Sequence, residues 1–330
     1  MADRWSPDHL RLHRWLRHRP GLLPARAVLL LAVSGGQDSM TLVALLQDLR
    51  RLYGWSLHLW HGDHALRPES AKQAQELADW ARQQQLPLKL DTWSQPRSGE
   101  AAARSWRYAC LIEQARALGA GHVITGHTAS DRAETLLLNL ARGCHRRGLA
   151  SLRARRPLAE AIVLVRPLLA FSRTDTARIS QQLALPVWPD PSNESAAFSR
   201  NRIRNEVLPV LENLHPGAAK RLSALSERLG EEEPAETELV ELALAGLQAS
   251  STPAALDRAA LMALAPANRR RLLRHWLQQR SGQELKASTL ETVLTRLDPQ
   301  RGPGRQRLSE ELELQWDRQR LWLAASEQLP

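Results

Sequence analysis

The sequence predicts an α/β protein with a doubly wound, mostly parallel sheet, followed by a helical linker and a small, mainly helical C-terminal domain. Short apolar runs alternate five times with longer amphipathic runs between residues 28 and 183. This alternation is typical of buried parallel strands joined by helices that cover both faces of the sheet. After Pro216 the pattern changes to Leu- and Ala-rich helical runs, which predicts a separate domain.

Each repeat pairs an apolar run with a helical one. In chain order they are Val28 to Val33 with Met40 to Leu52, Ser56 to Trp60 with Glu69 to Gln85, Leu86 to Trp93 with Glu100 to Leu118, His122 to Gly126 with Arg132 to Arg142, and Ala161 to Leu168 with Thr174 to Leu183. Ligands of such sheets bind beyond the carboxyl ends of the strands. We therefore expect the loops that carry Ser34, His61, Trp93 and His127 to converge there.

The chain is predicted to contain four segments. A helical extension covers residues 1–27, the α/β domain 28–190, a basic helical linker 191–215 and the C-terminal domain 216–330. Prolines 186 and 191 punctuate the end of the α/β domain. Residues 308–323 fit either strands or a helix. Residues 269–279 predict one amphipathic helix, with an inward face made of Leu272, Leu273, Trp276 and Leu277.

Composition limits the class of protein. The net charge of +10 favours a polyanionic partner, and a general bias toward arginine would explain part of it. Six arginines without an acid lie between Arg142 and Arg156. The chain has no run of about 18 apolar residues and no signal-peptide pattern, so we expect no membrane partner and a cytoplasmic location. Cys110 and Cys144 lack the spacing of an iron–sulfur or zinc site.

The segment with the most specific chemistry is the loop from Ser34 to Ser39, which reads SGGQDS between the first apolar run and its helix. A strand that enters a glycine-rich turn at a helix N-terminus directs backbone N–H groups and the helix dipole at one small volume, which suits a phosphate. Asp38 can bind a metal ion that offsets its repulsion of the phosphate. The loop matches neither GxxxxGK[ST] nor GxGxxG. The alternative is a turn that only caps the helix.

Two later strand ends also carry polar groups. His61 to Pro68 follows the second strand, and a nucleotide-lining role suits it better than a four-ligand metal site, because adjacent strand residues point to opposite faces. After the fourth strand, Asp131 and Glu134 are three residues apart on the first helical turn. There they can hold Mg²⁺ or a cationic amine. The alternative is a helix cap with a solvated acidic turn.

Basic groups form two further sets. Glu100, Arg104 and Arg107 share one helical face, which surface ion pairing explains equally well. Asp190-Pro-Ser-Asn193, followed by Arg200-Asn-Arg-Ile-Arg204, offers amide and guanidinium groups that suit RNA phosphates and base edges. A helix with solvated arginines is the alternative for the second set.

Taken in order, these five segments resemble the tRNA(Ile)-lysidine synthetase family of the ATP pyrophosphatase (PP-loop) superfamily, which has the adenine nucleotide alpha hydrolase-like fold. The family pattern runs SGGxDS, HxDHxLRP, ExxARxxRY, GHxxxDxxET with a downstream LxRG, and DxSNxxxxxxRNxxR. The match extends from Val28 to Leu211, and only Asn268 to Leu277 resembles the family's substrate domain beyond it. Ser130 departs from the aspartate of many members.

The resemblance implies a two-step ligation. ATP adenylates the C2 carbonyl oxygen of the cytidine at the first anticodon position of tRNA(Ile) with a CAU anticodon, and pyrophosphate is released. The ε-amine of L-lysine then displaces AMP and gives lysidine, which changes decoding from AUG to AUA. The implied partners are therefore ATP, Mg²⁺, L-lysine and tRNA(Ile). The sequence does not fix the oligomeric state, and a homodimer is one option.

The resemblance also assigns site residues, with Mg²⁺ placed on Asp38. The expected catalytic residues are Asp38, His127, Asp131 and Glu134. The expected ATP-binding residues are Ser34, Gly35, Gly36, Gln37, Asp38, Ser39, His61, Asp63 and Gly126. The expected tRNA-binding residues are Arg67, Arg104, Arg107, Arg142, Asn193, Arg200, Asn201 and Arg204.

Three other functions compete with this interpretation. A tRNA thiolase of the same superfamily would need cysteines spaced for sulfur or cluster chemistry, which the chain lacks. An amidating synthetase would share the ATP loop but gives no reason for the basic linker. A non-catalytic RNA-binding protein has no need of Asp38 or of the Asp131–Glu134 pair, and pyrophosphate release would distinguish it.

Overall fold

The computed structural model describes residues 5–65, 69–94, 99–144, 146–188, 199–249, 252–282 and 285–325. The chain divides into two compact units, Met1–Gly230 and Glu231–Pro330. The boundary lies inside helix α10 (Ala218–Gly246), later than the predicted change at Pro216. The reason is that the linker packs on the first unit: Leu208 and Ala219 form one small core with Ala133.

The first unit contains a six-stranded sheet in the order β3-β2-β1-β4-β6-β5. All neighbouring strands are parallel except β5, which runs antiparallel to β6 at the edge. The strands are β1 (Val28–Ala32), β2 (Ser56–Asp63), β3 (Leu88–Thr92), β4 (His122–Thr125), β5 (Arg155–Ala159) and β6 (Ile162–Val165). The chain order reverses between β1 and β4, and such a switch point is where open parallel sheets bind ligands.

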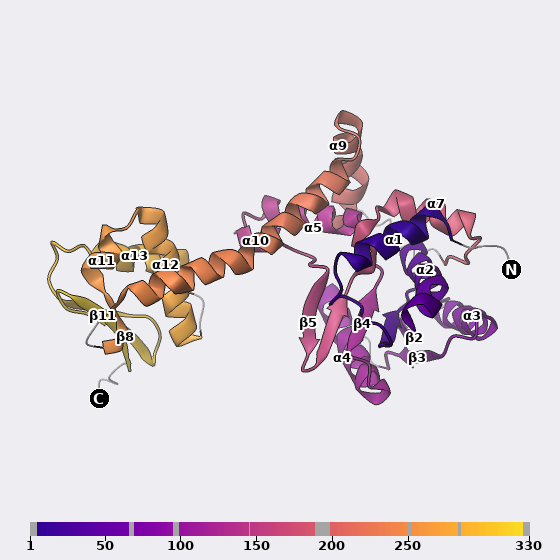
Figure 1. The fold of residues 1–330 in the computed structure, drawn as a ribbon, viewed down its shortest axis with the longest axis horizontal. Coiled ribbons are helices and arrows are strands. Elements are labelled where there is room, and N and C mark those ends of the chain that lie inside the picture. Colours follow the sequence, from indigo (N-terminus) through magenta and orange to yellow (C-terminus); the bar gives the residue numbers. More distant parts are fainter. Residues whose placement is uncertain are drawn as a thin grey trace. The chain divides into compact units, whose positions relative to one another are not determined.

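Helices cover both faces of this sheet, as the alternation predicted. In Figure 1, helices α1 and α2 lie on one side of the strands and α4 on the other. Leu29 and Leu31 of β1 join the core with residues of α1, α2 and α7, whereas Leu30 packs in a second core with residues of α4. The helices are α1 (Pro7–Arg17), α2 (Gln37–Tyr53), α3 (Ser70–Gln83), α4 (Glu100–Leu118), α5 (Ala129–Ala141), α6 (Arg146–Leu149), α7 (Arg173–Gln182), α8 (Ser199–Arg202) and α9 (Leu208–Leu214), with a 3₁₀ turn η1 (Pro167–Ala170) and a π turn η3 (Ile203–Val207). Successive strand residues point to opposite faces, so a fully apolar strand requires helices on both sides.

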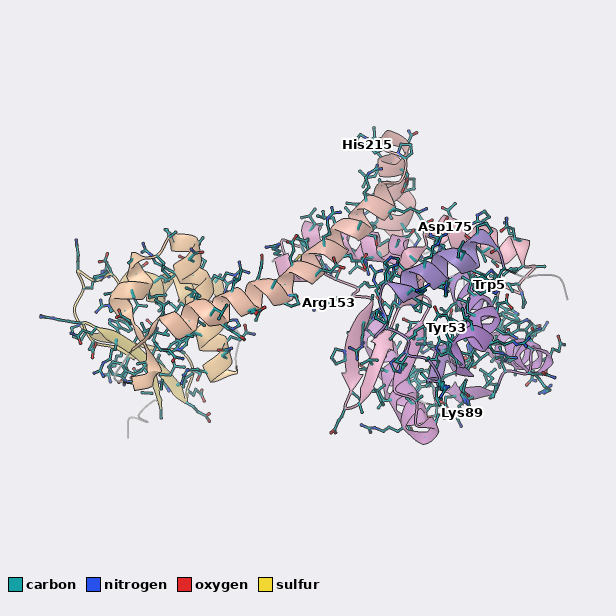
Figure 2. The ribbon with its side chains drawn as sticks, in the orientation of Figure 1. Trp5, Tyr53, Lys89, Arg153, Asp175 and His215 are labelled. Atoms are coloured by element: carbon teal, nitrogen blue, oxygen red, sulfur yellow. The ribbon has the colours of Figure 1, made fainter. Side chains whose placement is uncertain are left out.

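The N-terminal helix is fastened to α7. Arg11 pairs at 3.2 Å with Asp175, which lies near the start of α7 and is labelled in Figure 2. Arg178 pairs with Asp8 at 2.8 Å. Strand β5 was not predicted, because Arg155 and Arg156 interrupt the apolar pattern. An edge strand pairs on one side only and tolerates such residues.

The second unit adds a sheet to the helices that were predicted. Its five-stranded sheet has the order β7-β8-β11-β10-β9, with antiparallel neighbours throughout. Residues 308–323 thus form strands, and the expectation of a mainly helical domain missed this sheet. Its elements are β7 (Gln248–Ala249), β8 (Thr252–Asp257), α11 (Arg258–Ala263), α12 (Pro266–Ser281), α13 (Ala287–Arg296), β9 (Gly304–Arg307), β10 (Leu312–Trp316) and β11 (Arg320–Ala325).

Helix α12 confirms the predicted amphipathic helix. It buries the four apolar residues expected to face inward, Leu272, Leu273, Trp276 and Leu277.

Arg258 is fully buried and connects the loops of this unit, because its guanidinium donates to the carbonyls of Leu297, Asp298, Arg301 and Asp317. Among the described residues, no helix is both long enough and apolar enough to cross a membrane.

Candidate active site

The SGGQDS loop lies at the switch point, between the end of β1 and the start of α2. Gly35 has a φ of +83°, a conformation that glycine adopts without strain. The Ser39 hydroxyl donates to the Gly36 carbonyl at 2.9 Å and accepts the Ser34 backbone N–H at 3.2 Å. Gly36 is the N-cap of α2 and supplies no side-chain acceptor to the first turn. The first-turn amides of α2 are therefore suited to an anion, in line with the phosphate interpretation.

Trp188 holds this loop, and the sequence analysis did not single it out. Its backbone N–H donates to the Gly35 carbonyl at 3.0 Å, and its indole N–H donates to Glu76 of α3 at 2.6 Å. A Cβ added to Gly35 would lie 3.1 Å from the indole ring. The only available sequence signal was an aromatic residue in a proline-punctuated segment. Trp188 therefore fixes the position of the phosphate loop relative to α3.

Asp38 begins α2 in a partly buried, cation-rich position. Its carboxylate accepts a hydrogen bond from the Thr176 hydroxyl, and the Arg173 guanidinium lies 3.6 Å away. Burial raises the pKa of Asp38, and the nearby Asp131 carboxylate adds to that rise, whereas Arg173 opposes it. A carboxylate that is costly to ionise gains most from a bound cation, which fits the assignment of Mg²⁺.

Gly126, at the end of β4, touches the phosphate loop directly. A Cβ at this position would lie 3.1 Å from three backbone atoms of Asp38 and Ser39. A side chain at this position would force the loop or the end of β4 to shift by a few tenths of an ångström. Gly126 therefore belongs to the site as the place where the β4–α5 turn packs on the loop.

His61 and Asp63 support the neighbouring strand end. The His61 Nδ1 lies 2.8 Å from the Val33 carbonyl, just before the loop, and burial lowers the pKa of this imidazole. The Asp63 carboxylate accepts the Ala65 backbone N–H at 2.8 Å. His61 therefore supports the backbone between β1 and the phosphate loop, and Asp63 supports the turn after β2.

Asp131, on the first turn of α5, and Glu134, three residues later, are both buried. Each Glu134 oxygen accepts a 2.7 Å hydrogen bond, one from Arg200 and one from Arg204. Arg200 also donates to Asp131 at 2.8 Å. The carboxylates assigned to catalysis and the arginines assigned to tRNA are thus partners of one another in this structure. Spacing alone did not indicate this pairing, because α5 and α8 are far apart in the chain.

The alternative interpretation of this segment, in which Asp131 takes part in a helix cap, is correct in part. Asp131 forms a capping box with Thr128, whose backbone N–H donates to the carboxylate at 2.7 Å. Burial opposes ionisation, but the charge of Arg200 and the hydrogen bonds from Thr128 lower the pKa of Asp131. Its turn is buried and ion-paired, so the expectation of a solvated acidic turn does not apply. The Ser130 hydroxyl accepts the Arg173 backbone N–H at 3.1 Å and joins α5 to α7.

His127 is a neutral group in this site. Its Nδ1 lies 2.9 Å from the Thr125 hydroxyl. Burial lowers the pKa of His127 to about 3; Asp131 opposes that shift, and Arg166 and Arg200 reinforce it. The imidazole therefore carries no charge at neutral pH and can offer a hydrogen bond without repelling a cation.

The remaining tRNA-binding predictions fall at different places. Arg104 is exposed on α4 with its guanidinium 4.9 Å above the Tyr108 ring, and Arg107 donates to His64 at 3.3 Å. Arg142 is exposed at the end of α5, whereas Asn201 is buried, with 7 % exposure. Two predicted residues, Arg67 and Asn193, lie outside the described residues.

The carboxylates of this site suit a metal ion that is bound together with the substrate. Within the described ranges, no three His, Cys, Asp or Glu side chains are grouped to hold a metal ion by themselves. Mg²⁺ usually takes one or two carboxylates and completes its shell with water and substrate phosphates. Asp38 beside an anion-binding loop matches that arrangement.

The fold and the loop together define an ATP-binding PP-loop protein. The PP-loop domain family model matches residues 12–211, and the model for the TilS substrate binding domain matches residues 256–322. A tRNA thiolase, NcsA from Methanococcus maripaludis, superposes with a TM-score of 0.57 at 15 % identity, covering 67 % of this chain and 78 % of its own. At that identity the likeness shows a shared fold and nothing more.

Relatives that align along nearly the whole chain identify the family within this class of ATP-binding proteins. The tRNA(Ile)-lysidine synthase of Parasynechococcus marenigrum is 50 % identical, with 96 % of this chain and 94 % of the relative covered. That of a Prochlorococcus marinus strain is 42 % identical, with 95 % of each chain covered. The chain belongs to the tRNA(Ile)-lysidine synthase family.

Proposed function

We propose that this chain ligates L-lysine to carbon 2 of the first-anticodon cytidine of tRNA(Ile) with a CAU anticodon, consuming ATP and releasing AMP and pyrophosphate. The observation that carries the proposal is the meeting of an anion-binding loop with two buried carboxylates at the switch point. Relatives that align over nearly the whole chain are named for this activity, which supports it. The modified tRNA decodes AUA in place of AUG.

The phosphate loop performs the first step. The loop amides and the Ser34 and Ser39 hydroxyls bind the phosphates of ATP, and the α2 dipole favours their negative charge. Mg²⁺, held by Asp38 and the phosphates, would neutralise the charge that develops on the leaving pyrophosphate. The C2 carbonyl oxygen of cytidine attacks the α-phosphorus, and the new C–O–P linkage converts a poor leaving group into AMP.

The carboxylate pair serves the second step. Asp131 and Glu134 are buried anions that already bind a cationic side chain, and an ammonium group of lysine can replace a guanidinium there. One carboxylate of the pair accepts a proton from the ammonium group. The neutral ε-amine then attacks carbon 2, and the C2–O bond breaks as AMP leaves. Neutral His127 beside this pair adds no competing charge. Lysine binding therefore requires Arg200 or Arg204 to release its carboxylate, and the phosphates of tRNA are suitable acceptors for the freed arginine.

Asp38→Asn separates this proposal from RNA binding alone. The substitution keeps the shape of the side chain and removes its charge. We expect pyrophosphate release in the presence of tRNA(Ile) and ATP to fall at least about a hundredfold, because the lost charge acts on the developing pyrophosphate. The affinity for tRNA should change by less than about twofold. The matched control is Asp79→Asn on α3, whose carboxylate pairs only at the surface, with Arg82 at 2.8 Å. Equal pyrophosphate release by both variants would contradict the role of Asp38.

A further inference from the structure

A buried arginine without a full set of partners lies next to the active site. Arg166 follows β6, the neighbour of β4 on the side away from β1, and is only 3 % exposed. One of its terminal nitrogens donates to the Arg153 carbonyl at 2.6 Å, just before β5. Its Nε is buried and has no hydrogen-bond partner in the described part of the chain. A buried guanidinium that keeps a free donor is costly unless a ligand satisfies it.

Two more guanidinium groups gather beside it on one aromatic ring. Arg104 of α4 lies 4.9 Å from the centre of the Tyr108 ring, and Arg156 of β5 lies 5.0 Å from it. Across the described residues, no Asp or Glu forms an ion pair with Arg104, Arg156 or Arg166. The surrounding arginines lower the pKa of Tyr108 although burial alone would raise it. Arg104 and Arg156 thus share the Tyr108 ring, and Arg166 lies close enough for its charge to act on all three groups.

This cluster is built for an anion and is separate from the phosphate loop. The loop occupies the carboxyl end of β1, whereas Arg166 and Arg156 belong to β6 and β5, on the far side of β4. The phosphates of ATP already have their donors at α2. Free lysine carries two ammonium groups and one carboxylate, so its net charge is positive, and a cluster of three arginines favours it less than a phosphate. The anion of the proposed reaction that best fits the cluster is therefore the RNA backbone.

We propose that Arg104, Arg156 and Arg166, arranged around Tyr108, form a subsite for a phosphodiester group of the tRNA, next to His127. This subsite rests on the proposed function and adds Arg156, Arg166 and Tyr108 to it. The ring of Tyr108 fixes two of the guanidinium planes by cation–π contact, so little conformational freedom is lost when the phosphate binds. A phosphate held here anchors the nucleotide that must reach the adenylation site.

The first test compares two adjacent arginines of β5. Arg156 is half-buried in the cluster, whereas Arg155 is exposed and, by the alternation of a strand, points to the opposite face. For Arg156→Gln we expect tRNA(Ile) to bind about tenfold more weakly at 0.15 M salt, with the slope of log K against log salt reduced by about one. For Arg155→Gln we expect no change in slope. Equal losses for the two variants would overturn the subsite.

The second test identifies which phosphate is bound. Arg156→Gln should leave the KM for ATP within about twofold of the wild-type value, because the loop at α2 is untouched. A raised KM for ATP with unchanged tRNA affinity would mean that the cluster binds nucleotide, and the proposal would be wrong. Arg166→Lys, which keeps the charge but not the donor at Nε, should weaken tRNA binding while its unfolding midpoint stays near that of the wild type. Unchanged tRNA binding by a folded Arg166→Lys would also overturn it.

These readouts separate the subsite from the proposed function. If the wild-type chain forms lysidine and Arg156→Gln binds tRNA normally, only the subsite fails. If the wild-type chain transfers no lysine yet the two β5 variants differ in RNA affinity as expected, the subsite stands and the proposed function fails.

Discussion

Replacing Gly126 with alanine tests how the switch point is held together. The added methyl group would lie 3.1 Å from the Asp38 carbonyl carbon and from the Ser39 Cα and N. All three are backbone atoms, so no side chain can rotate away. Either the phosphate loop or the end of β4 must move by a few tenths of an ångström.

The size of the effect follows from this contact. Forcing one methyl group into a packed interior costs about 1 to 3 kcal/mol. A displacement of about 1 Å in a reacting group costs about a hundredfold in rate, so a shift of a few tenths should cost about tenfold. We therefore expect Gly126→Ala to lower the free energy of unfolding by about 1 to 3 kcal/mol and kcat/KM for ATP by about tenfold.

The control lies at the other end of the same strand. A Cβ at Gly121 would meet only the Ala161 carbonyl, at an ordinary 3.5 Å. Urea denaturation measures the stability of both variants, and pyrophosphate release as a function of ATP concentration measures the site. If Gly121→Ala and Gly126→Ala behave alike in both assays, close packing of β4 on the loop is not what positions the phosphates.

Three further outcomes are expected. Trp188→Phe keeps an aromatic ring but loses the hydrogen bond to Glu76, so the KM for ATP should rise a few-fold with kcat nearly unchanged. Trp188→Ala should raise the KM further. An unchanged KM in both variants would show that the loop needs no support from Trp188. Glu134→Gln removes the negative charge from a buried ion pair and should lower the free energy of unfolding, measured in urea, by about 3 to 5 kcal/mol. A loss below about 1 kcal/mol would mean that Arg200 and Arg204 find other partners. Burial would raise the pKa of Asp175, but hydrogen bonds from Ser172 lower this pKa to about 2, below the ordinary value near 3.9. The ionised Asp175 therefore stabilises the fold above about pH 4, and this stabilisation is lost as the pH falls toward 2. The stability difference between wild type and Asp175→Asn should shrink over that interval, and a difference that stays constant down to pH 2 would contradict this.

The α/β core was predictable because its signal is local. Each apolar run of β1 to β4 and β6 is followed by an amphipathic run. This alternation can be recognised in the sequence without knowing which strands pair with one another. Strand β5 escaped because Arg155 and Arg156 are charged, and an edge strand needs no apolar face on both sides. The C-terminal sheet escaped because its strands are short and amphipathic, so residues 308–323 also fit a helix.

The candidate site was predictable as a set of loops but not as a set of contacts. Parallel strands bring Ser34, Gly126 and Asp131 to one edge, which the order of elements already implies. The pairing of Glu134 with Arg204 joins elements separated by 70 residues, and no spacing rule connects them. Trp188 could not be found for the same reason: its role depends on the carbonyl of Gly35, a backbone atom that every residue carries.

The central claim is tested most directly by incubating the full chain with ATP, Mg²⁺, labelled L-lysine and unmodified transcripts of tRNA(Ile) and tRNA(Met), both of which carry a CAU anticodon. The proposal predicts label on tRNA(Ile) alone, with one AMP and one pyrophosphate released for each lysine incorporated. ATP turnover without label on tRNA(Ile), or equal labelling of the two transcripts, would contradict it.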